Sequence, residues 1–201
     1  MKSLKILNAY NKCGINQNDI QGLDLVDLVA SYNNKITNVS FMKSLKMLEA
    51  NKSGIDQNGI MNLDLYRFNA SENDRIVNAS FMKSLKILLV YGECGINQNG
   101  IQGLDLEELD TAHNDKIINV SFMKSLKKLN ACNSCGINQN GIQGLDLIDL
   151  NISNNDKITN ISFMKKMERL DISLNCNIGP SHLNGLELFW INTLDNKNFS
   201  N

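Results

Sequence analysis

The chain repeats one stretch of sequence along its whole length. The clearest copy reads FMKSLKILLVYGECGINQNGIQGLDLEELDTAHNDKIINVS, at residues 81–121. Its opening motif, FMKSLK, stands again at 41–46 and 122–127, and GINQNGIQGLDL returns unchanged at 136–147. Copies therefore follow one another every 40 or 41 residues. A fixed period of about 20–50 residues indicates a solenoid, in which each copy buries its apolar side chains against its neighbours.

Each period divides into two shorter repeats that share the pattern Leu-x-x-Leu-x-apolar. A long helix is excluded, because Asn, Gly and polar runs interrupt every repeat within about a dozen residues. A hairpin at the Asn-Gly steps is disfavoured, because no second alternating strand follows them. The sequence predicts a single repeat domain over residues 1–201, with a polar tail at 195–201. It contains about ten repeats, which start at Leu4, Leu25, Leu45, Leu65, Leu85, Leu106, Leu126, Leu147, Met167 and Leu188.

Asparagine and cysteine alternate at one place after the Leu-x-x-Leu-x-apolar pattern. One kind of repeat has asparagine there, at Asn33, Asn73, Asn114 and Asn155. The other kind has cysteine, at Cys13, Cys94, Cys135 and Cys176. A buried Asn can donate twice and accept from loop backbone groups, so these asparagines are predicted to form a structural ladder. The whole pattern resembles the leucine-rich-repeat family, and its short repeats are similar to those of cytosolic phosphatase regulators and bacterial internalins.

This resemblance implies an α/β repeat solenoid, built as a curved arc or horseshoe. A parallel β-sheet would line the concave face, and turns or 3₁₀ segments the convex face. Two departures from the family pattern, one residue inserted before Cys13 and one after Asn33, fall in the loop after the strand. A second regular column is predicted to stack as a spine in the core, and it consists of Phe41, Phe81, Phe122 and Phe163.

The copies differ most at the strand positions that should point outward from the sheet. The scaffold motifs are nearly constant, whereas these positions range from aliphatic to charged residues, and tyrosine is expected there. Tyrosine on an open sheet suits protein recognition. We therefore predict an apolar and aromatic binding zone followed by a charged flank. The candidate partner-binding residues are Tyr10, Val29, Tyr32, Tyr66, Ile87, Leu89, Tyr91, Glu108, Asp110, Lys128 and Arg169.

Composition argues against several classes of protein. The formal net charge is −1, so no overall field would gather nucleic acid or an anionic membrane. No apolar run approaches the roughly 18 residues of a membrane span, and residues 1–7 lack the apolar core of a signal peptide. Five cysteines are too few for a disulfide scaffold at this length. We expect a cytoplasmic protein that binds neither nucleic acid nor membranes.

Catalysis and metal binding are not expected either. Cys132 and Cys135 have the spacing of redox and zinc sites, but no second pair accompanies them. The loop Asn97–Gly100 lacks the glutamate of a calcium site, since Leu106 stands at its place. The two histidines do not recur with any repeated serine. We therefore predict no catalytic residues, no metal site and no cofactor.

The expected function follows from the family resemblance. It implies a non-catalytic scaffold for protein–protein interaction that binds an unidentified protein through the concave sheet. Two alternatives remain open: an adaptor or regulatory subunit of an enzyme complex, such as a phosphatase regulator or ubiquitin-ligase substrate receptor, and a secreted or surface recognition protein. Self-association is also expected through the uncapped N-terminal repeat. At the other end, Phe189 and Trp190 are predicted to close the edge of the sheet.

Overall fold

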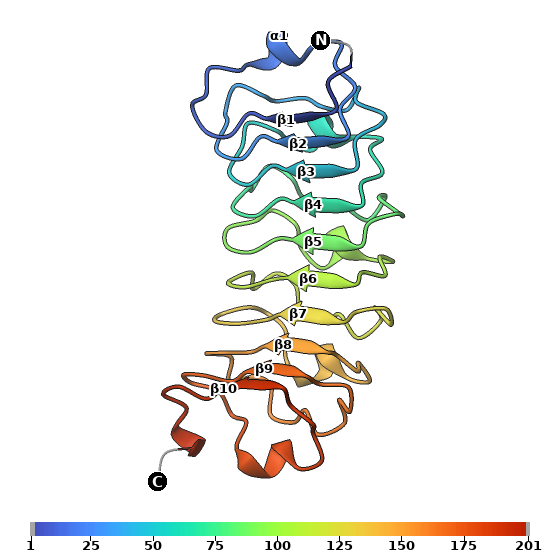
Figure 1. Cartoon of the computed structure of the whole chain (residues 1–201). Coiled ribbons are helices and arrows are strands. Elements are labelled where there is room, and N and C mark those ends of the chain that lie inside the picture. The colour runs from blue at the N-terminus through green and yellow to red at the C-terminus, as the bar shows by residue number, and fades with distance from the viewer. Residues whose placement is uncertain (1–2, 200–201) are drawn as a thin grey trace. The chain divides into compact units, whose positions relative to one another are not determined.

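The computed structural model describes residues 3–199. They divide into two compact halves, an N-terminal half up to Leu104 and a C-terminal half from Asp105. Each half is a stack of parallel three-residue strands, one per repeat (Figure 1). The N-terminal half contains β1 (Ile6–Asn8), β2 (Asp27–Val29), β3 (Met47–Glu49), β4 (Arg67–Asn69) and β5 (Ile87–Leu89). The C-terminal half contains β6 (Glu108–Asp110), β7 (Lys128–Asn130), β8 (Asp149–Asn151), β9 (Arg169–Asp171) and β10 (Trp190–Asn192).

Strands pair in parallel and in chain order within each half. Leu28 of β2 lies opposite Leu7 and Leu48, and Leu150 of β8 lies opposite Leu129 and Leu170. The segments between strands contain little helix. They form one short helix, α1 (Gln17–Ile20), and 3₁₀ turns at Asn58–Ile60, Asn99–Ile101, Gln139–Ile142 and Pro180–Leu183, and a further 3₁₀ turn, Lys197–Phe199, follows β10. The predicted repeat solenoid with a parallel sheet is confirmed.

The middle residue of each strand from β2 to β9 is buried in the core, and the segment leading to the strand supplies the rest. Ile36, Val39, Met42 and Leu45 are buried at steps of three residues. Backbone bonds of the i→i+3 type cause this spacing: Met42 N–H donates to Val39 C=O at 3.0 Å, and Leu45 N–H donates to Met42 C=O at 3.1 Å. A chain wound in this way has three residues per turn, so every third side chain faces inward.

The same winding corrects the prediction of a phenylalanine spine. The four phenylalanines are only half-buried, because each lies one residue before an inward position. The methionine that follows each of them is fully buried instead: Met42, Met82, Met123 and Met164. Methionine therefore forms the apolar column that was assigned to phenylalanine.

The asparagine ladder is confirmed. Asn73 is 2% exposed; its Nδ2 donates to the C=O groups of Ala50 at 3.2 Å and Ile55 at 3.0 Å, and its Oδ1 accepts from Arg75 N–H at 3.1 Å. Asn33 and Asn155 make the same three bonds with their own neighbours. The buried Asn114 accepts from Lys116 N–H. The tail contributes a further member, Asn196, which donates to Ile172 C=O and Ile178 C=O.

Cysteine fills the alternate places of this inner column, except in the third repeat, where the buried Ser53 stands. Cys94, Cys135 and Cys176 are buried as predicted, whereas Cys13 in the first repeat is exposed. Burial raises the pKa of the Cys135 and Cys176 thiols.

Two further side-chain links explain why the repeated motifs are constant. In the first link, Gln17 Oε1 accepts from the N–H groups of Thr37 and Asn38, and its Nε2 donates to Asn38 C=O. Gln57 and Gln139 bond in the same way, 20 and 21 residues ahead. This glutamine belongs to every Asn-Gln-Asn or Asp-Gln-Asn motif.

The second link joins the GLDL or NLDL motif to FMKSLK. Asp24 accepts from Ser44 N–H at 2.9 Å and from Ser44 Oγ at 2.6 Å, and these bonds hold the pKa of Asp24 below its usual value. Asp64 pairs with Ser84 and Asp105 with Ser125 in the same geometry. The residues that recur in the sequence are thus the ones that fasten one repeat to the next.

Glycine recurs where consecutive repeats approach most closely. A Cβ built on Gly54 would lie 2.6 Å from the carbonyl oxygens of both Asn34 and Ile36. A Cβ on Gly59 would meet the carbonyl oxygen of Thr37. The first repeat has Asp19 at the place of Gly59.

Candidate binding surface

The outward face of each sheet consists of the first and third residues of every strand. In the N-terminal half the first residues are Ile6, Asp27, Met47, Arg67 and Ile87, and in the C-terminal half they are Glu108, Lys128, Asp149, Arg169 and Trp190. All of them are half-buried or exposed. The chemistry of this column changes from strand to strand.

The third strand residues are more constrained than the sequence suggested. Val29, Glu49 and Leu89 hold this place in three repeats. In the other seven repeats it is Asn or Asp, whose Oδ1 accepts the N–H two residues later: Asn8, Asn69, Asp110, Asn130, Asn151, Asp171 and Asn192. Such side chains form Asx turns that end the strand. The recurrence of Asn and Asp at this column could have revealed that turn from the sequence.

Ion pairs cross the face between neighbouring strands. Arg67 Nε lies 3.0 Å from Glu49 Oε1, and Asn69 Nδ2 donates to Glu49 Oε2 at 2.7 Å. In the C-terminal half, Lys128 Nζ lies 3.9 Å from Glu108 Oε2. Arg169 Nε lies 3.4 Å from Asp149 Oδ2, and the Arg169 guanidinium stacks 5.2 Å from the centre of the Trp190 ring.

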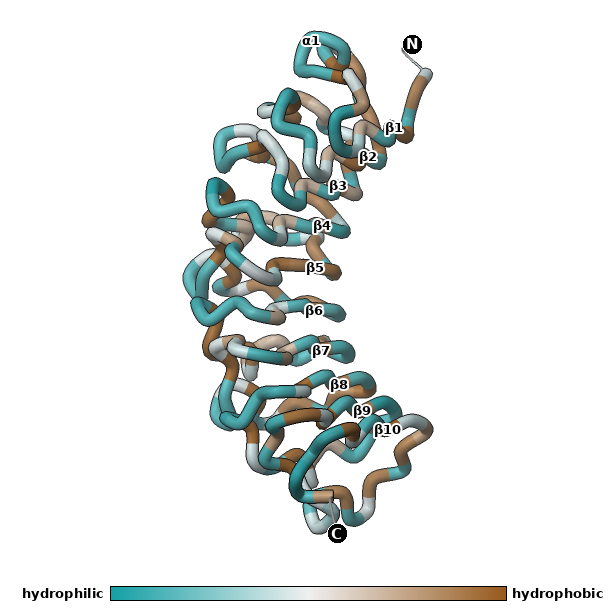
Figure 2. Tube along the Cα trace, turned by 90° about the vertical axis from the view of Figure 1, so that its left-hand side faces the viewer, coloured by the Kyte–Doolittle hydropathy of each residue, from teal (hydrophilic) through white to brown (hydrophobic). Residues whose placement is uncertain are grey.

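The apolar part of the face belongs to the N-terminal half. Val29, Met47, Ile87 and Leu89 are half-buried on it. The strand β5 is coloured as hydrophobic along its length in Figure 2. The ion pair of Arg67 and Glu49 on β4 and β3 lies between the apolar residues of β2 and those of β5. The predicted apolar residues are therefore present but do not form one uninterrupted patch.

The tyrosines lie outside the strands, contrary to the expectation from the sequence. Tyr10 and Tyr32 follow β1 and β2, and their rings pack edge to face with centres 5.6 Å apart. Tyr32 has a positive φ of 61°, at a turn where other repeats have residues such as Lys52 and Leu174 in the same left-handed conformation. Tyr66 precedes β4 and so lies at the opposite end of the strands.

Tyr91 is tied to the third repeat. Its Oη accepts from Asn51 Nδ2 at 2.7 Å. Asn51 is buried, and its Oδ1 has no hydrogen-bond partner among residues 3–199. Buried side-chain acceptors without a partner are uncommon in folded proteins.

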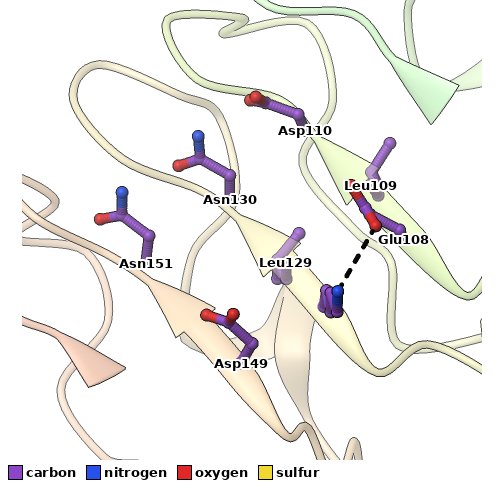
Figure 3. A pocket seen from close by; sticks show the side chains of 8 residues that line it. Glu108, Leu109, Asp110, Leu129, Asn130, Asp149 and Asn151 are labelled. Atoms are coloured by element: carbon purple, nitrogen blue, oxygen red, sulfur yellow. Dashed lines mark ion pairs between the residues drawn. The ribbon is translucent and has the colours of Figure 1, made fainter. Parts of the chain in front are cut away.

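A hollow of about 280 Å³ opens on the sheet face of the C-terminal half (Figure 3). Asp110, Asn130 and Asn151 stand side by side along one wall, at the ends of β6, β7 and β8. The remaining lining residues are Glu108, Leu109, Lys128, Leu129 and Asp149. The hollow unites three predicted site residues, Glu108, Asp110 and Lys128, whereas Arg169 is not among its lining residues.

The charge of this hollow is negative. Burial raises the pKa of Asp110, and its hydrogen bonds to Ala112 N–H and to the Asn130 side chain partly oppose that shift. No cation of the described chain forms an ion pair with Asp110 or Asp171, although Lys128 and Arg169 are paired with other carboxylates. A half-buried carboxylate without a cation favours a positively charged or hydrogen-bond-donating ligand.

The thiols have the features of structural groups. Burial raises the pKa of Cys132, so the thiolate needed for nucleophilic attack is disfavoured. Cys132 and Cys135 both lie inside the fold. Within residues 3–199, no three His, Cys, Asp or Glu side chains gather in a way that could hold a metal ion.

Comparison with known proteins identifies no family. No protein-family model matches the chain, and no curated protein is significantly similar to it. No helix in the described part of the chain is both long and apolar enough to cross a bilayer. The protein is a parallel-sheet repeat solenoid with a buried asparagine ladder.

Proposed function

We propose that this solenoid is a non-catalytic scaffold of the leucine-rich-repeat type that binds a protein partner through its outward sheet face. One observation carries the proposal. The residues repeated in every copy, such as Gln57 and Asp64, are occupied in bonds between repeats. The residues that vary between copies lie on the open face of the sheet. When selection acts on recognition, the residues that hold the repeats together are expected to stay constant, and the residues on the exposed face of the sheet are expected to vary.

The partner is proposed to be a cytoplasmic protein rather than a nucleic acid or a membrane. In the C-terminal half, no cation among the described residues forms an ion pair with Asp110 or Asp171. Lysine or arginine side chains of a partner protein would therefore make their most favourable electrostatic interactions there. In the N-terminal half, aliphatic side chains of β2, β3 and β5 supply apolar contact area. The proposal includes no cofactor and no catalytic group, since the inward cysteines are buried.

The test compares two charge-matched variants of the full chain. Asp110→Asn with Asp171→Asn removes the charge but keeps the strand-ending turn, because Asn already makes that bond in five repeats. Asp115→Asn with Asp156→Asn is the control, because both residues are exposed beyond their strands, at the place where the second repeat has Asn34. In affinity capture with quantitative mass spectrometry, we expect a partner retained by the wild type and the control but depleted at least fivefold by the face variant. Identical captures by all three proteins would refute binding through this face.

A further inference from the structure

Strand β10 exposes its middle residue, whereas the middle residues of β2 to β9 are buried. Ile191, its middle residue, is 38% exposed, whereas Leu170 at the same place in β9 is fully buried. Beside it, Phe189 is 85% exposed, Leu194 66% and Trp190 40%. The prediction that Phe189 and Trp190 close the sheet is therefore wrong for Phe189, because its ring packs against almost nothing in the described chain.

The backbone of β10 also has an unpaired edge. Trp190 N–H donates to Glu168 C=O at 3.0 Å, and Asn192 C=O accepts from Ile172 N–H at 3.0 Å. These bonds direct residues 190 and 192 toward β9. The alternate residue, Ile191, therefore carries its N–H and C=O on the other edge of the strand. An apolar edge strand with free backbone groups is a template for pairing with another chain.

The N-terminal end of the solenoid has a different character. Helix α1 covers part of it, and Asn18 and Asp19 on that helix are exposed. Asp19 stands at the place that Gly59 holds in the third repeat. At Gly59 a Cβ would collide with the carbonyl oxygen of Thr37 in the preceding repeat. A copy stacked on this end as one repeat stacks on another would collide with the Asp19 side chain. Head-to-tail continuation of the solenoid is thus disfavoured.

We propose that β10 is a dimer interface, in which it pairs antiparallel with β10 of a second copy about a two-fold axis at Ile191. Both Ile191 backbone groups then find partners, and Phe189, Trp190 and Leu194 lie against the β10 segment of the other copy, with Phe189 opposite Thr193 and Trp190 opposite Asn192. A two-fold interface uses one surface twice and closes after two chains.

The exposed area supports a dimer of moderate affinity. With about 150–250 Å² per large apolar side chain, the exposed fractions amount to roughly 500 Å² per copy. A pair would bury about 1,000 Å², which lies at the lower limit for a specific interface. We therefore expect association in the micromolar range.

Sedimentation velocity of the full chain between about 1 and 300 µM tests the interface. The wild type should shift with concentration toward a mass near twice 22.5 kDa and then stop. Phe189→Ser with Leu194→Ser should raise the dissociation constant at least tenfold. Val77→Ser removes a 48% exposed apolar side chain elsewhere and should change nothing. A wild type that stays monomeric, or an equal effect of the control, would overturn the proposal.

The two-fold geometry has its own readout. Ile191→Cys, in a Cys13→Ser background that removes the exposed thiol, should form a disulfide-linked dimer under mild oxidation. Growth beyond a dimer with increasing concentration would show head-to-tail assembly and refute the two-fold arrangement. Both outcomes are measured on the protein alone, without a binding partner, so they are independent of the proposed recognition through the sheet face.

Discussion

Replacing Asn73 by alanine removes one rung of the asparagine ladder and leaves two backbone groups, Ile55 C=O and Arg75 N–H, without partners, whereas Ala50 C=O keeps the bond from Ser53 N–H. The side chain is 2% exposed and spans two carbonyl groups, at 3.2 and 3.0 Å, and one N–H group, at 3.1 Å. Each unsatisfied buried group costs about 1–3 kcal/mol. Partial relaxation toward water reduces that total, so we expect a loss of about 2–4 kcal/mol in the free energy of unfolding. Domains of this size are stable by about 5–15 kcal/mol, so the loss is large.

Urea unfolding followed by far-UV circular dichroism measures this loss. Asn34→Ala is the matched control, because Asn34 is exposed and lies one residue after the ladder asparagine of its repeat. The control should change the free energy of unfolding by less than about 0.5 kcal/mol. An Asn73→Ala protein that loses less than about 1 kcal/mol would show that the ladder is not a main source of stability. The comparison requires a similar dependence of the unfolding free energy on urea in all variants.

Three further outcomes are expected. Met82→Ala should cost about 2–5 kcal/mol in urea unfolding and Phe81→Ala clearly less, since the methionine is fully buried and the phenylalanine is not; the reverse order would refute the three-residue winding. The pKa values of Asp24, Asp64 and Asp146 are lowered in the folded protein, so these carboxylates stabilise the fold at a pH above their unfolded pKa. They lose this effect as they become protonated, and the melting temperature should therefore fall as the pH drops below about 4. A melting temperature that does not change with pH in this range would contradict the stabilising role of these three carboxylates. With a thiol reagent under native conditions, Cys13 should react at least tenfold faster than the buried cysteines, and equal rates would contradict their burial.

The period of the sequence was sufficient to predict the strands and the ladder. Every strand lies within the Leu-x-x-Leu-x-apolar pattern, and Asn33, Asn73, Asn114 and Asn155 all lie inside the fold. Periodicity could not choose between Phe81 and Met82, because both recur in every copy. The choice depends on the phase of the 3₁₀-like winding, which the backbone bonds of the assembled repeat determine.

The candidate site was harder to predict for the same reason. Outward strand positions such as Ile87 and Glu108 were placed correctly, because side chains alternate along a strand. Tyr32 and Tyr66 were misplaced, because the strands are only three residues long and end earlier than the apolar pattern. Asp110 was assigned to recognition, but it also ends its strand, a dual use that appears only when its bond to Ala112 is seen.

The side-chain links have a consequence for how such a chain can lengthen or shorten. Asn73 reaches back from the fourth repeat to the third, Gln57 reaches forward from the third to the fourth, and Asp64 joins the ends of the same two repeats. Asn33, Gln17 and Asp24 join the first two repeats in the same way. Gain or loss of two consecutive repeats, a pair of about 40 residues, preserves all of these bonds. Gain or loss of a single repeat of about 20 residues would instead place an Asn or Gln side chain beside a repeat that lacks its hydrogen-bond partners. The unit of inheritance and of engineering in this solenoid is therefore the pair, which is the unit that the sequence copies.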